Sequence, residues 1–429
     1  MKEDFLHYIW KLQLVTHKNL VCTDKKALIV LNQGQHNFDA GPDFFNAKIK
    51  IGNQIWAGNV EIHVKASDWY VHNHEVDSNY DAVILHVVWE NDAQIFRKDN
   101  SVIPTLILKD FVPDAVLQNY RQLLSKSHNW INCENDISSI DDFLFNNWLE
   151  RLYIERLEQK SALILELLET SKNDWEAVLF ILLAKNFGLK VNGDAFLSFA
   201  KSIDFNVVRK VRQNQKDLEA LLFGCANLLE DVVDNTYFSE LKARYEYQKV
   251  KFKLKNTFHK KVQFFRLRPN NFPTIRLAQL AALYYKHHNL FSKINEVKNS
   301  KDFYTIFEII TSDFWQTHYT FSAATKSKRN KKLTKSFIDL LLINTVMPLQ
   351  FIYHKQHGKD KGELIIEMMR QLKPEKNTII NHFNSLNIEA KSAFKTQALL
   401  QLKNNYCSKN KCVQCAIGNA LLLHKNTSN

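Results

Sequence analysis

The chain has 429 residues, of which 45% are hydrophobic and 24% are charged, and this mixture excludes a largely disordered protein. Its formal net charge of +12 favours anionic partners, nucleic acid among them. The N-terminus lacks the layout of a signal peptide, and no run of about 18 apolar residues occurs. We therefore expect a cytoplasmic protein of two or three domains that spans no membrane, and the sequence gives no indication of its oligomeric state.

Residues 1–112 predict an α/β domain. An amphipathic helix opens the chain, with Phe5, Ile9 and Trp10 at helical spacing. Segments with the pattern of strands follow at 27–31, 44–51, 55–65, 82–89 and 105–108. Gly52 and Asn53 predict a tight turn between the second and third of these strands.

Residues 113–429 predict a helical body. Apolar residues recur at helical spacing through 141–168, and similar stretches continue to the end of the chain. Only 10 Gly and 7 Pro occur in the whole sequence, which suits long helices. The predicted fold class is therefore α+β, with an N-terminal α/β domain packed against a large all-helical domain.

The third predicted strand carries three polar side chains on one face. Because side chains alternate along a strand, Glu61, His63 and Lys65 point the same way, while the apolar residues between them point the other way. Such a surface can hold a hard cation beside a general base, as phosphodiester hydrolysis requires. The alternative is that these residues form the solvated side of an antiparallel strand.

A second carboxylate, Asp43, precedes the neighbouring strand. In a simple two-residue hairpin at Gly52 and Asn53, Asp43 would lie opposite Ile62 and away from Glu61. A bend just before the strand, or a bulge at Gly58, would shift the pairing by one residue and bring Asp43 beside Glu61. The predicted site depends on such an irregularity.

The pair Pro42-Asp43, followed by an acidic residue and a lysine on the next strand, resembles the PD-(D/E)XK or restriction-endonuclease-like nuclease superfamily, whose core is an αβββαβ unit. The resemblance implies a nuclease with Asp43 and Glu61 as ligands of Mg or Mn. His63 stands where the superfamily has its lysine, and Lys65 follows two residues later, so either could take that role. The alternative is a non-catalytic nucleic-acid-binding or scaffold protein of the same fold.

A longer pattern extends through the helical part of the chain. Gly41-Pro42-Asp43-Phe44, the segment 268–279 and the C-terminal cysteines are similar to a bacterial family catalogued as a domain of unknown function. That resemblance spans most of the chain and implies no activity.

Histidines are concentrated near the predicted site, at positions 36, 63, 72, 74 and 86. A His-x-His pair with a nearby acid can also bind a transition metal, as in cupin-like hydrolases or oxygenases. His86 lies within an apolar strand and is therefore predicted to be a hydrogen-bonded core residue. For His72 and His74 both a metal site and a polar loop stay open.

Three cysteines near the C-terminus, Cys407, Cys412 and Cys415, have the spacing of metal ligands. A closed site needs a fourth ligand, for which Cys133 is the first candidate and Cys22 the second. Some nucleases of the resembled superfamily hold an iron–sulfur cluster with three late cysteines and a distant one, which implies [4Fe-4S]. Zinc is an equal alternative to the cluster, and three incidental thiols are the less favoured interpretation.

A basic run predicts contacts with the phosphate backbone of nucleic acid. Its candidate residues are Lys326, Lys328, Arg329, Lys331 and Lys332. A solvated loop is the alternative interpretation.

Overall fold

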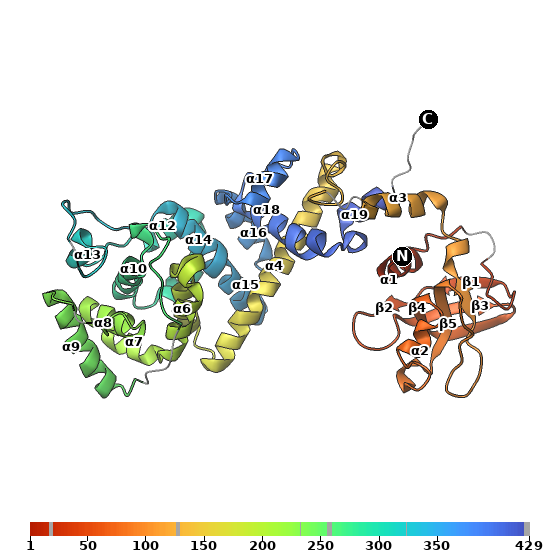
Figure 1. Ribbon diagram of the computed structural model, residues 1–429, viewed down its shortest axis with the longest axis horizontal. Coiled ribbons are helices and arrows are strands. Elements are labelled where there is room, and N and C mark those ends of the chain that lie inside the picture. The colour runs from red at the N-terminus through yellow and green to blue at the C-terminus, as the bar shows by residue number, and fades with distance from the viewer. Residues whose placement is uncertain (17–19, 126–128, 232, 255–259, 323, 424–429) are drawn as a thin grey trace. The chain divides into compact units, whose positions relative to one another are not determined.

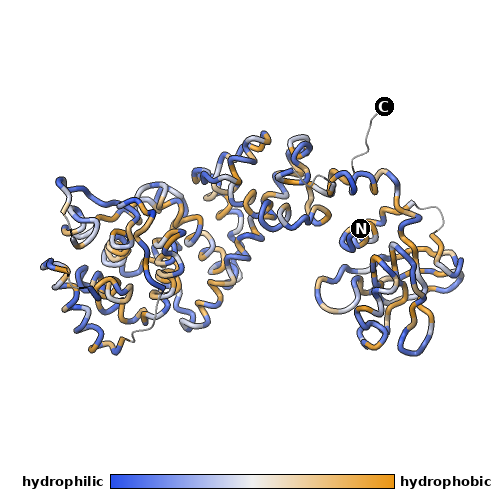
Figure 2. The backbone as a smooth tube through the Cα atoms, viewed as in Figure 1, coloured by the Kyte–Doolittle hydropathy of each residue, from blue (hydrophilic) through white to orange (hydrophobic). Residues whose placement is uncertain are grey.

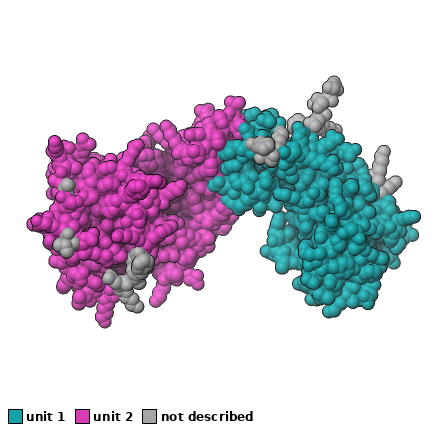
Figure 3. Space-filling model, in the orientation of Figure 1, with its two compact units in different colours: residues 1–148, 402–429 teal, residues 149–401 magenta. Residues whose placement is uncertain are grey.

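The computed structural model describes residues 1–16, 20–125, 129–231, 233–254, 260–322 and 324–423. The chain forms two compact units, shown separately coloured in Figure 3. Unit 1 comprises residues 1–148 and 402–429, and unit 2 comprises residues 149–401. The predicted boundary at 112/113 falls inside unit 1, and the C-terminal segment, predicted as part of the helical domain, belongs to unit 1 as well.

Unit 1 is built around a mixed sheet of six strands among the described residues, which confirms the α+β class. The strands are β1 (Leu28–Asn32), β2 (Gln35–His36), β3 (Phe44–Ile51), β4 (Gln54–Lys65), β5 (Val83–Glu90) and β6 (Thr105–Ile107). Their order is β1-β3-β4-β5-β6, with β2 pairing on β3. Each of the five predicted strands is present, whereas β2 has only two residues and no periodicity by which it could be predicted.

Helices α1 (Glu3–Leu12), α3 (Asp114–Ser125) and α19 (Ala416–Leu423) pack on one face of this sheet (Figure 1). The single turn α2 (Asp68–Val71) packs on the opposite face, where Trp69 lies against His86 of β5. Phe5 and Ile9 of α1 are fully buried in a core shared with Val60 and Ile62 of β4, and the ring of Phe5 stacks on Tyr120 of α3 at 3.8 Å. The C-terminal helix α19 packs on α3. This non-local contact explains why the chain end joins unit 1.

The hairpin of β3 and β4 contains a one-residue bulge. Near the turn, paired residues follow the simple register, as in Ala47 opposite Gly58, but Phe44 pairs with Val60. The extra residue lies in β3, where Asn46 has the left-handed φ of 58°. Asn adopts this conformation more readily than other non-glycine residues. The bulge moves Asp43 to the position opposite Glu61.

Gly58, the predicted location of the bulge, has a different role. A Cβ at this position would lie 2.5 Å from the carbonyl oxygen of Ala82 and 2.5 Å from Cγ2 of Ile84. Glycine therefore permits the close approach of the chain that leads into β5, which runs parallel to β4.

The connection between β4 and β5 carries little regular structure. An αβββαβ core would have a helix between these strands, and the described residues have the single turn of α2 and the 3₁₀ turn η1 (Ser78–Tyr80). The remaining 3₁₀ turns of unit 1 are η2 (Leu108–Asp110), η3 (Ile137–Ser139), η7 (Cys407–Lys409) and η8 (Cys412–Gln414), and η6 (Leu402–Tyr406) is a π-helical turn.

The regular secondary structure of unit 2 is helical among its described residues, as predicted for this part of the chain, apart from an isolated bridge between His318 and Ala324. The long helix α4 (Asp142–Thr170) begins in unit 1 and continues into unit 2. Its other α-helices are α5 (Trp175–Phe187), α6 (Leu189–Ser202), α7 (Phe205–Val211), α8 (Gln215–Cys225), α9 (Thr236–Lys251), α10 (Pro273–Lys286), α11 (Leu290–Glu296), α12 (Ser300–Ile306), α13 (Asp313–Thr317), α14 (Lys335–Leu341), α15 (Met347–Gln356), α16 (Gly362–Gln371), α17 (Thr378–Ser385) and α18 (Ala393–Gln401), with a 3₁₀ turn η4 (Pro269–Asn271) and a π-helical turn η5 (Leu342–Val346).

Polar N-caps and apolar cores explain these helices. Asp174, Asp204 and Asn377 each accept a hydrogen bond from a backbone N–H of the first turn that follows. Hydrophobic residues occur in short stretches along the helices (Figure 2). The stretch Lys335–Gln356 has the length and hydropathy of a membrane span, but it is mostly buried inside unit 2, and a core helix meets the same criteria.

Candidate functional site

The bulge lets each of the two predicted carboxylates accept a hydrogen bond from the backbone across the hairpin. The Ile62 N–H donates to Oδ2 of Asp43 at 2.9 Å, and the Asp43 N–H donates to Oε2 of Glu61 at 3.1 Å. These reciprocal hydrogen bonds hold both side chains at the end of β3 and the middle of β4. Asp43 is half-buried, while Glu61 is only 4% exposed.

Helix α1 supplies two further groups that the sequence analysis missed. Nε2 of His7 lies 3.2 Å from Oδ2 of Asp43 and 3.7 Å from Oε1 of Glu3. Glu3 and His7 are four residues apart and therefore share one face of the helix. An acid and a histidine at this spacing on the polar side of the first helix were the available signal, but only the fold shows that this side meets Asp43.

Three histidines gather on the other side of Glu61. Nε2 of His63 lies 3.4 Å from Oε1 of Glu61 and 3.2 Å from Nδ1 of His72. Nε2 of His74 lies 3.3 Å from the same Glu61 oxygen. One ligand atom from each of the three histidines lies within 4.8 Å of the others, and the same holds for Glu3, His7 and Asp43. We call these six residues, together with Glu61, the carboxylate–histidine cluster.

The turn after α2 directs His72 and His74 back toward β4. The N–H of His72 donates to the Asp68 carbonyl, and the N–H of His74 donates to the Trp69 carbonyl, both at 3.0 Å. Asn73 between them has a φ of 59°, the left-handed conformation typical of a helix C-terminus. The ring of His74 also stacks on Tyr80 at 3.7 Å, so its orientation is fixed.

His86 on β5 supports His63 from behind. Its Nε2 lies 2.8 Å from Nδ1 of His63, and its side chain is fully buried against Trp69. His86 is therefore a hydrogen-bonded core residue of the kind predicted. Its partner is His63, so it also determines which nitrogen of His63 can face Glu61.

Burial controls protonation in the cluster. Burial, followed by the charge of Asp43, raises the pKa of Glu61 to about 9. Burial, followed by the neighbouring His74 and His72, lowers the pKa of His63 to about 3. For His7, burial is the largest single effect and lowers the pKa, but the hydrogen bond to Asp43 and the charges of Asp43, Glu3 and Glu61 together outweigh it, so the pKa is raised. Glu61 is thus protonated and His63 is neutral, and the two side chains are in contact where both are buried from solvent.

Lys65 lies apart from these residues. It pairs with Glu90 at the end of β4 and its side chain is exposed. Among the described ion pairs none joins Lys65 to Asp43 or Glu61. Of the two residues considered for the superfamily's lysine position, His63 is therefore the one in contact with Glu61.

The predicted cysteines come together in unit 1. Cys133, Cys407, Cys412 and Cys415 line one small cavity and form what we call the cysteine cluster. The Asn132 side-chain amide donates to Sγ of Cys412 at 3.3 Å, and the backbone N–H groups of Ile417 and Gly418 donate to Cys415. Cys22 and Cys225 are buried in the cores of unit 1 and unit 2, away from this cavity.

The basic run divides into exposed and buried members. Lys326, Lys328, Arg329 and Lys332 are exposed. Lys331 is 6% exposed, and its ammonium group donates to the carbonyl groups of Trp315 at 2.6 Å and His318 at 3.0 Å. Lys331 is thus a structural residue of unit 2, which corrects its prediction as a phosphate contact.

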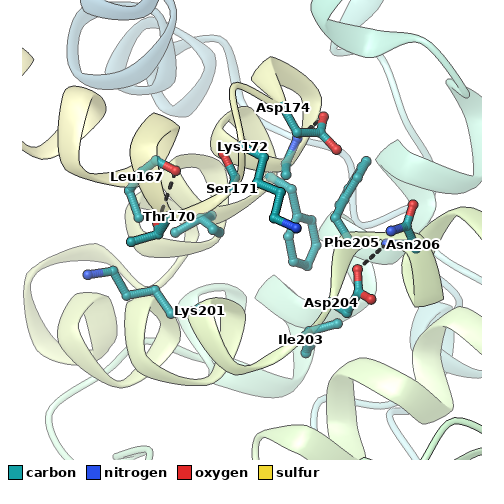
Figure 4. Close-up of a pocket in the computed structure, with 13 residues that line it drawn as sticks. Leu167, Thr170, Ser171, Lys172, Asp174, Lys201, Ile203, Asp204, Phe205 and Asn206 are labelled. Carbon is teal, nitrogen blue, oxygen red and sulfur yellow. Dashed lines mark hydrogen bonds between the residues drawn. The ribbon is translucent and has the colours of Figure 1, made fainter.

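Unit 2 also contains a pocket of about 510 Å³ that holds no predicted site residue. Figure 4 shows its lining from the end of α4 and from the connection between α6 and α7. Of the polar groups on it, the two carboxylates, Asp174 and Asp204, are already used as N-caps of α5 and α7. Their commitment to the helices favours a structural origin for this hollow.

Residues 3–378 match the family described as Protein of unknown function (DUF2851). The chain belongs to this family. The match includes the whole carboxylate–histidine cluster, from Glu3 to His74, and ends before Cys407. Comparisons with curated proteins and with solved structures find no match.

Proposed function

We propose that this member of the DUF2851 family is a divalent-metal-dependent hydrolase of phosphodiester bonds in nucleic acid. The observation that carries the proposal is the bulge in β3, which turns Asp43 toward Glu61 and locks both carboxylates by reciprocal hydrogen bonds. A local irregularity that re-aims a side chain is characteristic of functional sites.

The topology supports a nuclease-like domain. The antiparallel strands β1, β3 and β4, followed by the parallel strand β5 and preceded by α1, have the order and directions of an αβββαβ core. The single turn of α2 is shorter than the second helix of that core. The likeness to restriction-endonuclease-like nucleases therefore rests on strand order and on the two carboxylates.

The residues present fit a divalent cation. Glu3, His7 and Asp43 offer ligand atoms within 4.8 Å of one another, and Glu61 adjoins Asp43, so a cation bound here would replace the proton of Glu61. A bound cation would polarise the phosphate and lower the pKa of an attacking water. His7 orients Asp43, His63 and His74 orient Glu61, and the exposed His72 is the imidazole that substrate and water can reach.

Exposed basic residues of unit 2 would contribute binding to the phosphate backbone. The four exposed members of the basic run keep their charges at the surface, although Lys328 and Lys332 also pair with Asp313 and Glu308. Ion pairs at such exposed positions are weak, so phosphate can displace them. Binding of this kind is salt-dependent and tolerant of sequence.

The cysteine cluster would hold a structural cofactor. Four thiols around one cavity, with N–H groups aimed at two of the sulfurs, have the character of a thiolate metal site. A tetrahedral zinc site requires sulfur atoms about 3.8 Å apart. Among the described residues no three cysteines have Sγ atoms all within 4.8 Å of one another, and this wider spacing favours an iron–sulfur cluster over zinc.

The test is cleavage by the full chain with Glu61→Gln, using Glu90→Gln as a matched control on the neighbouring strand. Glutamine keeps the shape of Glu61 but cannot supply a negative charge to a cation. We expect divalent-dependent cleavage of DNA or RNA by the wild type and Glu90→Gln, and none by Glu61→Gln, with equal melting temperatures. Nucleic-acid binding without cleavage by the wild type would establish the scaffold alternative instead.

A further inference from the structure

We infer that His63, His72 and His74, with Glu61, form a binding site for a nitrogen-preferring transition metal ion of the zinc type, rather than for Mg²⁺. This inference deepens the proposed function by naming the metal class of the same cluster. The catalytic role of the ion rests on the proposed function, whereas the binding of the ion is independent of it.

The distances between the donor atoms match tetrahedral coordination. Zinc–nitrogen bonds of 2.0–2.1 Å give tetrahedron edges of about 3.3–3.4 Å. The three measured separations are 3.2 Å from His63 Nε2 to His72 Nδ1, 3.4 Å from His63 Nε2 to Glu61 Oε1, and 3.3 Å from His74 Nε2 to Glu61 Oε1. Three contacts among these four side chains therefore have the length of a tetrahedron edge, and one ligand atom from each histidine lies within 4.8 Å of the others.

Hydrogen bonds can hold these side chains, from Nδ1 of His72 to Nε2 of His63 and from Nε2 of His74 to Glu61, and a metal ion would replace the protons of those bonds. If Nδ1 of His63 donates its proton to Nε2 of His86, Nε2 of His63 presents a lone pair, as a metal-binding imidazole must. That lone pair faces an oxygen of Glu61 only 3.4 Å away. Two acceptors held this close in a buried place need a proton or a cation between them. A metal ion would satisfy both together with His72 and His74.

The donor set discriminates between metals. Mg²⁺ prefers oxygen ligands in an octahedral shell and retains several waters. Imidazole nitrogens suit zinc, iron, nickel or copper. Three histidines from one strand and one turn, held by the stack of His74 on Tyr80 and by His86 behind His63, form a site already arranged for such an ion.

The exposed position of His72 makes the site testable without disturbing the core. We would load metal-free full-length protein with Co²⁺ and Zn²⁺, and compare the wild type with His72→Gln and with His36→Gln. His36 is the matched control, because its ring stacks on Phe44 outside the three histidines. Cobalt bound to imidazole and carboxylate lacks the thiolate charge-transfer band, which separates this site from the cysteine cluster.

We expect one equivalent of Zn²⁺ at this site, an affinity about tenfold or more weaker in His72→Gln, and no change in His36→Gln. Millimolar Mg²⁺ should not displace the zinc. Equal zinc and cobalt binding by His72→Gln and the wild type, or displacement by Mg²⁺, would overturn the inference. Zinc binding that depends on His72 in a protein without cleavage would refute only the proposed function. Mg²⁺-dependent cleavage unaffected by His72→Gln would refute only the metal assignment.

Discussion

Asn46 should be the residue on which the geometry of the carboxylates depends. Its φ of 58° creates the bulge that sets Asp43 opposite Glu61, while its own side chain is exposed and its backbone N–H is held by the side chain of Asn59 at 3.3 Å. A substitution at this position therefore changes the backbone preference and removes no packing. Asn46→Val and Asn46→Gly form the informative pair.

The expected cost follows from the backbone conformation. The left-handed region costs an ordinary residue about 1–2 kcal/mol and is least accessible to β-branched residues, whereas glycine enters it freely. For a unit of this size, each kcal/mol lowers the melting temperature by roughly 2–4 °C. Asn46→Val should therefore melt about 2–8 °C lower in unit 1, and Asn46→Gly should stay close to the wild type.

Activity and metal binding should respond more strongly than stability. A bulge that relaxes would withdraw Asp43 from the Ile62 N–H, and displacement of a reacting group by about 1 Å can reduce a rate about 100-fold. Calorimetry, metal titration and cleavage measured on both variants test this. The reasoning fails if Asn46→Val melts, binds metal and cleaves as Asn46→Gly does.

Three further predictions concern other parts of the chain. Cys412→Ser should release the cofactor of the cysteine cluster and lower the melting temperature, while Cys225→Ser should retain the cofactor. Visible absorbance distinguishes an iron–sulfur cluster from zinc. Protein that purifies without iron or zinc would contradict both cofactor assignments. Replacing Lys326, Lys328, Arg329 and Lys332 by glutamate should weaken nucleic-acid binding for every sequence and make its salt dependence shallower. Lys331→Met should instead cost about 1–3 kcal/mol of stability and leave the affinity of the folded protein unchanged. Unaltered affinity of the fourfold glutamate variant would assign the basic run to a solvated loop. Burial and the nearby Arg156 lower the pKa of Lys160 to about 7. Between pH 7 and 10 the unfolded chain therefore binds more protons at Lys160 than the folded chain does, and the free energy of unfolding should rise with pH. Urea unfolding should show this rise in the wild type and not in Lys160→Met.

The strands of unit 1 were predictable because alternation of polar and apolar residues is a local signal. The register of β3 against β4 was predictable only in part. The sequence analysis required an irregularity, either a bend just before the strand or a bulge at Gly58, but the extra residue lies in β3 at Asn46, and Gly58 makes room for Ala82 and Ile84. Glycine and asparagine both permit unusual backbone, and which of them bulges depends on a neighbouring strand that the hairpin sequence does not contain.

Non-local contacts explain the remaining differences. Local periodicity places Glu3 and His7 on one face of α1, but only the packing of α1 on the sheet brings them beside Asp43. The boundary at 112/113 was drawn where periodicity changes, yet α3 and α19 complete the core that covers the sheet. Lys331 looked like its basic neighbours until the fold placed it under two carbonyl groups.

Helix α1 connects the two candidate metal sites of unit 1. Its polar face presents Glu3 and His7 to Asp43, while the helix also contacts the turn η8 that carries Cys412, and Val413 of that turn is buried in the same core as Phe5. A cofactor held by the cysteine cluster would fix this end of the helix, because binding free energy becomes folding free energy. The order of the carboxylate–histidine cluster would then depend on a group bound by Cys133 together with Cys407, Cys412 and Cys415, which is a physical reason for the C-terminal segment to return to unit 1.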